Sequence, residues 1–169
     1  MNSININKND DYWLHIEGFE SWMKGIDALF SRIIEKKYFG SKGFSVNLLL
    51  TNDGDIRELN RNFRNSDTPT NVLSFPQYES ASICKIDTIA KGDKVILGDI
   101  AMSYEKIMRE SKEFHFKFFD RCSHLFVHGV LHLFGMDHVD SISEIEMENL
   151  EIQILSEFGI ENPYILKGE

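Results

Sequence analysis

Histidine spacing is the feature of this sequence with the clearest chemical meaning. Four of the six histidines lie between residues 124 and 138, and the spacing of His128 and His132 places both imidazoles on one face of a helix. Gly135 follows them, and a glycine at a helix end lets the chain turn back and bring His138 close. Three neutral imidazoles suit zinc and leave its fourth position open to water or substrate. The pattern therefore predicts one Zn²⁺ per chain, bound by His128, His132 and His138.

His124 supports two other interpretations of the cluster. A structural zinc site is usually closed by a fourth protein ligand, and His124, one helical turn before His128, is the nearest candidate. A histidine on an apolar helix is also often simply packed in the core, and we assign His124 to this role ahead of one in orienting a ligand. Two carboxylates, Asp99 and Asp137, are candidates for the acceptor that orients a ligand imidazole, with capping of a turn as the alternative.

Gly129 separates this motif from the zinc peptidases. The spacing HxxxHxxGxxH from His128 to His138 is that of the long metalloprotease motif, in which a glutamate follows the first histidine. That glutamate is the general base that deprotonates the attacking water. With glycine at this position a peptidase or amidohydrolase would lack its base, so the sequence favours a metal hydrolase that acts on a different electrophile.

Three arginines make a phosphate the better candidate. Arg57, Arg61 and Arg64 are spaced so that they share one face of a helix, and a guanidinium can bind a phosphate through two parallel hydrogen bonds. Arg57 and Arg61 are expected to form a solvated surface stripe. Arg64 instead leads into the turn-rich segment 65–71 ahead of a strand, where functional side chains are often placed. Arg64 is therefore the candidate for a functional phosphate contact.

Three sequence blocks resemble, in the same order, the signature blocks of the YbeY family of bacterial rRNA maturation factors. They are LNRNFRNSDTPTNVLSFP (59–76), LGDIAMS (97–103) and HGVLHLFGMDH (128–138). The resemblance places the zinc ligands of the family on His128, His132 and His138, and its functionally important arginine on Arg64.

The resemblance also implies an activity and partners. It implies a zinc-dependent endoribonuclease, specific for single-stranded RNA, that matures the 3′ end of small-subunit rRNA and takes part in ribosome quality control. The implied partners are rRNA and the small ribosomal subunit or its proteins. A noncatalytic ribosome assembly factor stabilised by zinc is the main alternative. The chain departs from the family pattern outside the predicted ligands, at Phe63, Asn71 and Met136.

Composition restricts the remaining possibilities. The chain has 18 Lys and Arg residues against 27 Asp and Glu residues, a formal net charge of −9, which excludes a uniformly basic nucleic-acid coat protein but allows local basic patches. Cys84 and Cys122 show no CxxC spacing, so neither a zinc knuckle nor a disulfide framework is expected. The N-terminal segment is polar and no run of about 20 apolar residues occurs, so we predict a cytoplasmic protein without a membrane segment.

An α+β fold must position these residues. The 169 residues correspond to about one domain, 1–169. Apolar periodicity predicts helices at 19–37, 55–63 and 118–134, another that begins after Ser103, and a last one that continues from Ser141 to Gly159. Short apolar runs predict strands at 44–50, 71–75 and 94–101, with a surface loop or irregular hairpin at 77–93. Ser141 and Glu144 have the spacing of a capping box. These patterns predict an α+β fold, a small β-sheet packed by helices, with the metal site on the buried helix of the C-terminal half and the turn that follows it. That the sheet is mixed is what the resemblance to the YbeY family implies.

Overall fold

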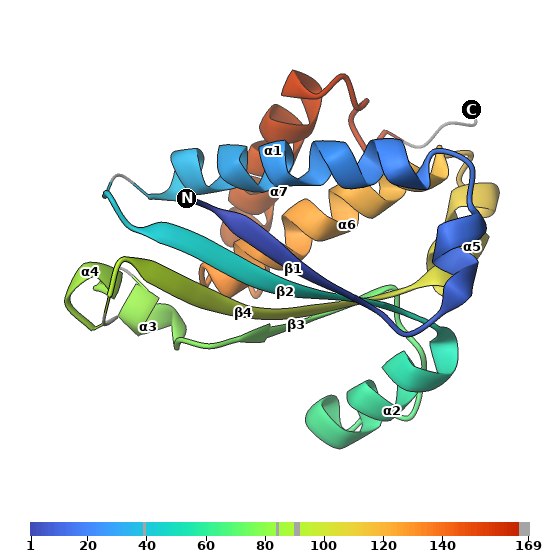
Figure 1. Ribbon diagram of the computed structural model, residues 1–169, viewed down its shortest axis with the longest axis horizontal. Coiled ribbons are helices and arrows are strands. Elements are labelled where there is room, and N and C mark those ends of the chain that lie inside the picture. Colours follow the sequence, from blue (N-terminus) through green and yellow to red (C-terminus); the bar gives the residue numbers. More distant parts are fainter. Residues whose placement is uncertain (39, 84, 90–91, 166–169) are drawn as a thin grey trace.

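A mixed four-stranded sheet forms the centre of the computed structural model, which describes residues 1–38, 40–83, 85–89 and 92–165 (Figure 1). The strands lie in the order β1-β2-β4-β3. Their bounds are β1 Ser3–Lys8, β2 Gly43–Thr51, β3 Val72–Pro76 and β4 Lys94–Ser103. β1, β2 and β4 are parallel, whereas β3 runs antiparallel to β4 at one edge of the sheet. The predicted α+β class with a small mixed sheet is confirmed.

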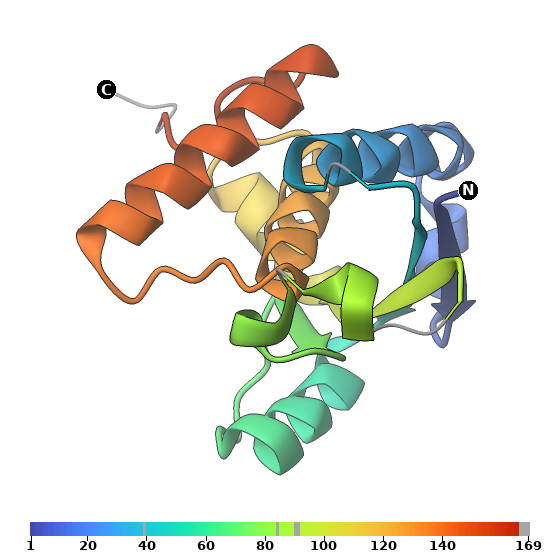
Figure 2. The same cartoon turned by 90° about the vertical axis from the view of Figure 1, so that its left-hand side faces the viewer.

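Helices cover the two faces of the sheet unequally. α1 (Phe19–Lys37) and α6 (Phe118–Leu133) lie across one face, and α7 (Ser141–Glu157) packs outside them. α2 (Asp53–Arg64) lies on the opposite face and covers only one end of it (Figures 1 and 2). Two further helices, α5 (Tyr104–Glu113) before α6 and the short 3-10 helix η1 (Asp11–His15) before α1, complete the covered side.

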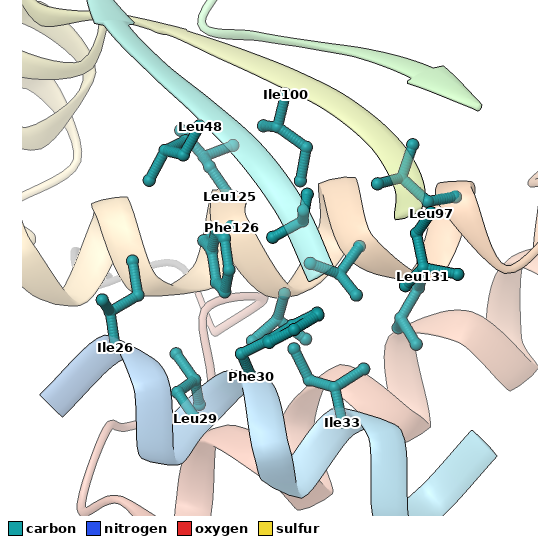
Figure 3. Packing of buried hydrophobic residues seen from close by; sticks show 14 of the residues in the cluster. Ile26, Leu29, Phe30, Ile33, Leu48, Leu97, Ile100, Leu125, Phe126 and Leu131 are labelled. Carbon is teal, nitrogen blue, oxygen red and sulfur yellow. The ribbon is translucent and has the colours of Figure 1, made fainter. Parts of the chain in front are cut away.

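The main hydrophobic core lies between the sheet and the pair α1 and α6. α1 begins and ends where its apolar periodicity predicts, and Ile26, Phe30 and Ile33 are each at most 1% exposed. Phe30 meets Phe126 of α6 edge to face, with ring centroids 6.3 Å apart, and Leu48 of β2 belongs to the same cluster (Figure 3). Burying a side chain of this size contributes about 1.5–3 kcal/mol relative to exposure, so the core fixes the position of α6.

Two segments, β1 and residues 77–93, differ from the sequence prediction. β1 has no predicted counterpart, because its two isoleucines alternate with asparagines and are only half-buried against the core. The segment 77–93, predicted as a loop or hairpin, contains the short helices α3 (Ser80–Ile83) and α4 (Ile86–Ile89). Ile86 is 3% exposed and anchors α4 to the core, which explains local order in a segment without a clear period.

The cap of α7 lies one residue before its predicted position. Asp140, rather than Ser141, is the N-cap, and its carboxylate accepts from the backbone N–H of Ile142 at 3.0 Å and of Ser143 at 2.9 Å. Ser143 completes the capping box in place of Glu144. An aspartate carboxylate can accept both orphan amides at once, which favours it over the neighbouring serine. The other predicted helices and strands are present, with ends shifted by a few residues.

The sequence also made predictions about the cysteines and about membrane segments, and the structure bears on both within the described residues. Cys122 is buried and free, whereas Cys84 lies outside the described residues. None of the helices in the described ranges combines the length and the apolarity that crossing a membrane requires.

Candidate metal centre

α6 and the turn after it carry the three histidines predicted as ligands. His128 and His132 lie one turn apart on α6, with their Nε2 atoms 3.0 Å apart. At Gly135 the backbone has a φ of +80°, a left-handed conformation that glycine adopts without strain, and its N–H donates to the carbonyl of His132 at 2.9 Å. The chain then returns so that the ring centroid of His138 lies 5.6 Å from that of His128 and 5.1 Å from that of His132.

The three rings form one nitrogen cluster. A ring nitrogen from each of His128, His132 and His138 lies within 4.8 Å of the others. His128 and His132 are half-buried and His138 is exposed, so the cluster is open to solvent on one side. Burial first, and then the neighbouring imidazoles, lower the pKa of His132, which favours the neutral ring that a metal ligand must be. This donor set fits zinc and other divalent cations that accept imidazole.

Glu151 of α7 is a fully buried carboxylate behind the cluster, with 0% exposure. It accepts hydrogen bonds from Nδ1 of His128 at 2.8 Å and from Nε2 of His124 at 2.9 Å, and the hydroxyl of Tyr164 also donates to it. Because an ionised carboxylate only accepts, Nδ1 of His128 carries the proton and Nε2 keeps its lone pair. The carboxylate thus presents to the cluster the nitrogen that a metal requires.

Arg121 fixes the proton of His124 from the other side. Nη1 of Arg121 lies 2.8 Å from Nδ1 of His124. A guanidinium only donates, so Nδ1 accepts and the proton of His124 is on Nε2, facing Glu151. Arg121 is held in turn by Glu110, at 2.8 Å, and Glu110 accepts from the side-chain amide of Asn71 at 3.1 Å. A hydrogen-bonded network therefore connects the histidine cluster with Asn71.

The carboxylate of Glu151 stays ionised at neutral pH. Burial alone would raise the pKa of Glu151, but the hydrogen bonds from His124 and His128 and the electrostatic interactions with these two side chains together outweigh burial and hold this pKa at about 2. Burial lowers the pKa of His124, and burial followed by the bond to Glu151 raises the pKa of Tyr164. One carboxylate, one neutral imidazole and one phenol therefore form the centre of the network.

The prediction that Asp99 or Asp137 orients a ligand imidazole is wrong, because their hydrogen bonds in the described chain go elsewhere. Asp137 accepts from the backbone N–H of His138 at 2.8 Å, which is the turn-capping alternative. Asp99 accepts from the side-chain amide of Asn47 at 2.7 Å, on the sheet face opposite α6. Glu151 takes the orienting role instead.

His124 is neither a fourth metal ligand nor merely a packed histidine. Both of its ring nitrogens are engaged, one by Arg121 and one by Glu151, so it belongs to the network behind the cluster. One feature of the sequence indicates that Glu151 is buried. It lies four residues after Met147 and four before Leu155, on the buried stripe of α7. A charged residue on such a stripe requires a buried partner.

Gly129 faces the sheet rather than the metal site. A Cβ atom at this position would lie 3.1 Å from Oγ of Ser74 and 3.1 Å from Cδ1 of Ile100, and Oγ of Ser74 already donates to the carbonyl of Gly129 at 3.2 Å. A side chain after His128 would therefore require Ser74 and Ile100 to shift by a few tenths of an ångström. Close packing against the sheet thus favours glycine at the position where a peptidase has its base.

A cleft of about 620 Å³ connects the histidine cluster with Arg64. Arg64 is exposed at the end of α2, and its Nη2 donates to the backbone carbonyl of Ser74 in β3 at 2.9 Å. This bond anchors the guanidinium while using one of its five N–H groups. Arg57 instead pairs with Asp67 at 2.9 Å, and Arg61 is exposed on the outer surface. Of the three arginines, Arg64 is the one that lines the cleft.

Comparison with known proteins gives the family. A family model described as endoribonuclease YbeY matches residues 6–159. The chain belongs to the YbeY family. The endoribonuclease YbeY of Sphingopyxis alaskensis is 43% identical to it over 121 residues, 70% of either chain. That of Sinorhizobium fredii is 37% identical over 149 residues, 88% of this chain and 82% of the relative.

A solved structure supports the fold of this YbeY chain. The solution structure of TM1509 from Thermotoga maritima matches with a TM-score of 0.57 at 23% identity, covering 93% of this chain and 92% of that one. This likeness concerns the fold alone. The family match confirms the family and the class of enzyme predicted from the three sequence blocks, an endoribonuclease that hydrolyses RNA phosphodiester bonds.

Proposed function

We propose that this YbeY chain is a zinc-dependent endoribonuclease specific for single-stranded RNA. In this proposal His128, His132 and His138 hold one Zn²⁺, and Arg64 is the catalytic residue that binds the scissile phosphate. The substrate is the 3′ end of small-subunit rRNA, and the protein acts in the cytoplasm with the small ribosomal subunit or its proteins. The resemblance of the three signature blocks supports this substrate.

One observation carries the catalytic part of the proposal: Arg64 and the histidine cluster line the same cleft. The histidines come from α6 and its following turn, whereas Arg64 comes from α2, in the other half of the chain. Cleavage of a phosphodiester needs a Lewis acid and donors for the nonbridging oxygens, and this cleft combines candidates for both.

Each part of the site has a distinct chemical role. A divalent cation held by the three imidazoles supplies a Lewis acid that polarises a phosphoryl oxygen and activates water. Arg64 binds nonbridging oxygens and stabilises the additional negative charge of the transition state. Its bond to the Ser74 carbonyl holds the guanidinium in place before substrate arrives, so less conformational entropy is lost on binding. Glu151 keeps the ring of His128 in the required tautomer.

Replacement of Arg64 tests this assignment. Arg64→Ala should keep metal content and thermal stability but lower cleavage of a single-stranded RNA about 100-fold or more, because one lost donor to a transition state costs about 2.7–4 kcal/mol. Arg64→Lys should restore part of the rate, since an ammonium cannot form the bidentate contact. Arg61→Ala is the matched control, because it removes the same charge from an exposed position on α2. Parental cleavage by Arg64→Ala would remove Arg64 from the mechanism.

A further inference from the structure

A groove lies on the sheet face that α2 leaves open. α2 covers one end of the face opposite α1 and α6 (Figure 1). Between the last turns of α2 and the strands the structure has a groove of about 390 Å³. Its walls include Leu59 and Phe63 of α2 together with Asn47, Phe75 and Asp99 of the sheet. The groove thus combines apolar, aromatic and hydrogen-bonding groups.

Phe63 and Phe75 form an aromatic platform at one side of the groove. Their ring centroids are 5.3 Å apart and their planes make an angle of 68°, so the rings pack edge to face. Phe75 is half-buried, whereas Phe63 is 65% exposed. The contact with Phe75 restrains the ring of Phe63, and an exposed aromatic ring held in this way can stack on another flat ring.

A row of polar side chains extends from this platform across the sheet. Asn5, Asn47 and Asp99 are register partners on β1, β2 and β4, and Phe75 of β3 continues the row. The amide of Asn5 donates to Asn47 at 3.0 Å, and the amide of Asn47 donates to Asp99 at 2.7 Å. Amide and carboxylate groups have capacity for more than one hydrogen bond, and such donors and acceptors match the edge of a nucleobase.

The edge strand β3 lines both the groove and the metal cleft. Side chains alternate along a strand, and here Ser74 and Pro76 line the metal cleft while Phe75 lines the groove. Neighbouring residues of α2 also face different sites. Arg64 lines the metal cleft, and Phe63, the residue before it, lines the groove. Because β3 is an edge strand of the sheet, one RNA strand that passes around this edge can contact both sites.

We propose that the groove binds an unpaired nucleobase of the RNA whose phosphate lies on Arg64. The base stacks on Phe63 and presents its hydrogen-bonding edge to Asn47 and Asp99. The carboxylate of Asp99 suits a base N–H group and repels a phosphate, so the groove selects bases rather than backbone. Because a base inside a duplex is already stacked and paired, this contact favours single strands. The inference rests on the proposed function, and the base contact would explain why the enzyme prefers single-stranded RNA.

Phe63→Ala tests the inference in the metal-loaded, full-length protein. Binding is measured by fluorescence anisotropy with a labelled, nuclease-resistant phosphorothioate single strand, and kcat and KM are measured with unmodified RNA. Phe63→Ala should raise Kd and KM about fivefold or more, as loss of one base stack does, with kcat changed less than about twofold. Phe63→Trp should restore binding. Phe158→Ala, an exposed phenylalanine at the end of α7, should match the parent and serves as the control.

An RNA series with single abasic nucleotides locates the bound base. At one position, removing the base should weaken RNA binding by the parent protein as much as Phe63→Ala weakens binding of the intact RNA. The Phe63→Ala variant should bind the RNA that lacks this base as tightly as it binds the intact RNA. Because Phe63 is largely exposed, the variant should fold, and unchanged metal content and thermal unfolding would verify this.

The two proposals fail in different ways. If Phe63→Ala leaves Kd and KM unchanged while Arg64→Ala loses cleavage, the base site is overturned and the proposed function stands. The groove would then fit a protein side chain instead. If the parent does not cleave RNA but binds it in a manner that depends on Phe63, the base site is supported and the proposed function is overturned.

Discussion

Replacing Glu151 by glutamine should weaken metal binding without removing a ligand. The carboxylate accepts from His128, His124 and Tyr164, whereas a glutamine amide has one acceptor oxygen and an NH₂ group that only donates. His124 cannot adapt, because Arg121 already donates to its Nδ1. His128 is therefore the partner that must change. Its Nδ1 becomes an acceptor, and its proton moves to the Nε2 that faces the histidine cluster.

The structure also indicates the size of this effect. Removing the acceptor that orients a ligand histidine typically lowers metal affinity about 10- to 100-fold, or about 1.4–2.7 kcal/mol. Folding stability should fall as well, because a hydrogen bond to a charged group contributes about 1.5–3 kcal/mol. Glu151 is 0% exposed, so water cannot replace the lost partner. Both losses should occur at neutral pH, where the carboxylate is ionised.

Competition with a chromophoric zinc chelator measures the affinity directly. The comparison includes the parent, Glu151→Gln and Glu146→Gln, since Glu146 is exposed on the same helix and its replacement changes the charge equally. Glu146→Gln should bind zinc as the parent does. Thermal unfolding of each protein with and without zinc separates the effect on the fold from the effect on the metal. Zinc binding by Glu151→Gln with parental affinity would refute the tautomer argument, even if the variant were less stable.

Three other predictions test the ligands, the pH dependence and the nucleophile. His132→Ala should lose stoichiometric metal and thermal stability together, and elemental analysis that still finds one zinc per chain would contradict the ligand assignment. The pKa of His132 lies below its usual 6.5, so the unfolded chain binds the proton first as the pH falls. Stability should therefore decline on acidification below about 6.5, and urea unfolding at several pH values that showed the opposite trend would count against this. A single 2′-deoxy substitution at the scissile nucleotide should leave cleavage intact, because water is the proposed nucleophile. Complete resistance with normal binding would assign the attack to the RNA 2′-hydroxyl.

The metal cluster could be predicted because its geometry is almost entirely local. His128 and His132 share a helical face by their spacing alone, and Gly135 marks the turn that returns His138. No knowledge of distant parts of the chain was required. Arg64 is different, since its position beside the cluster depends on how α2 and β3 pack, and its assignment came from its turn-rich context and from the family resemblance.

The fold was predictable where the apolar pattern was long. α1 buries its residues with the expected period over its whole length, and its bounds match the prediction. β1 has six residues and pairs with a strand far away in sequence, with Ser3 opposite Ser45, so little in its local pattern indicates a strand. The order of β3 and β4 in the sheet likewise depends on long-range pairing rather than on the composition of either strand.

Glu151 shows what a single helix pattern leaves undetermined. α7 contains several glutamates, and the pattern places only this one among Met147, Ile154 and Leu155 on the buried stripe. Burying an ionised carboxylate is costly unless donors reach it, so the pattern implies partners without naming them. A ligand histidine has the complementary requirement, because its second nitrogen needs an acceptor. The packing of α7 against α6 meets both requirements at once, with Glu151 facing His128, and this makes the packing of α7 part of the metal site rather than only part of the core.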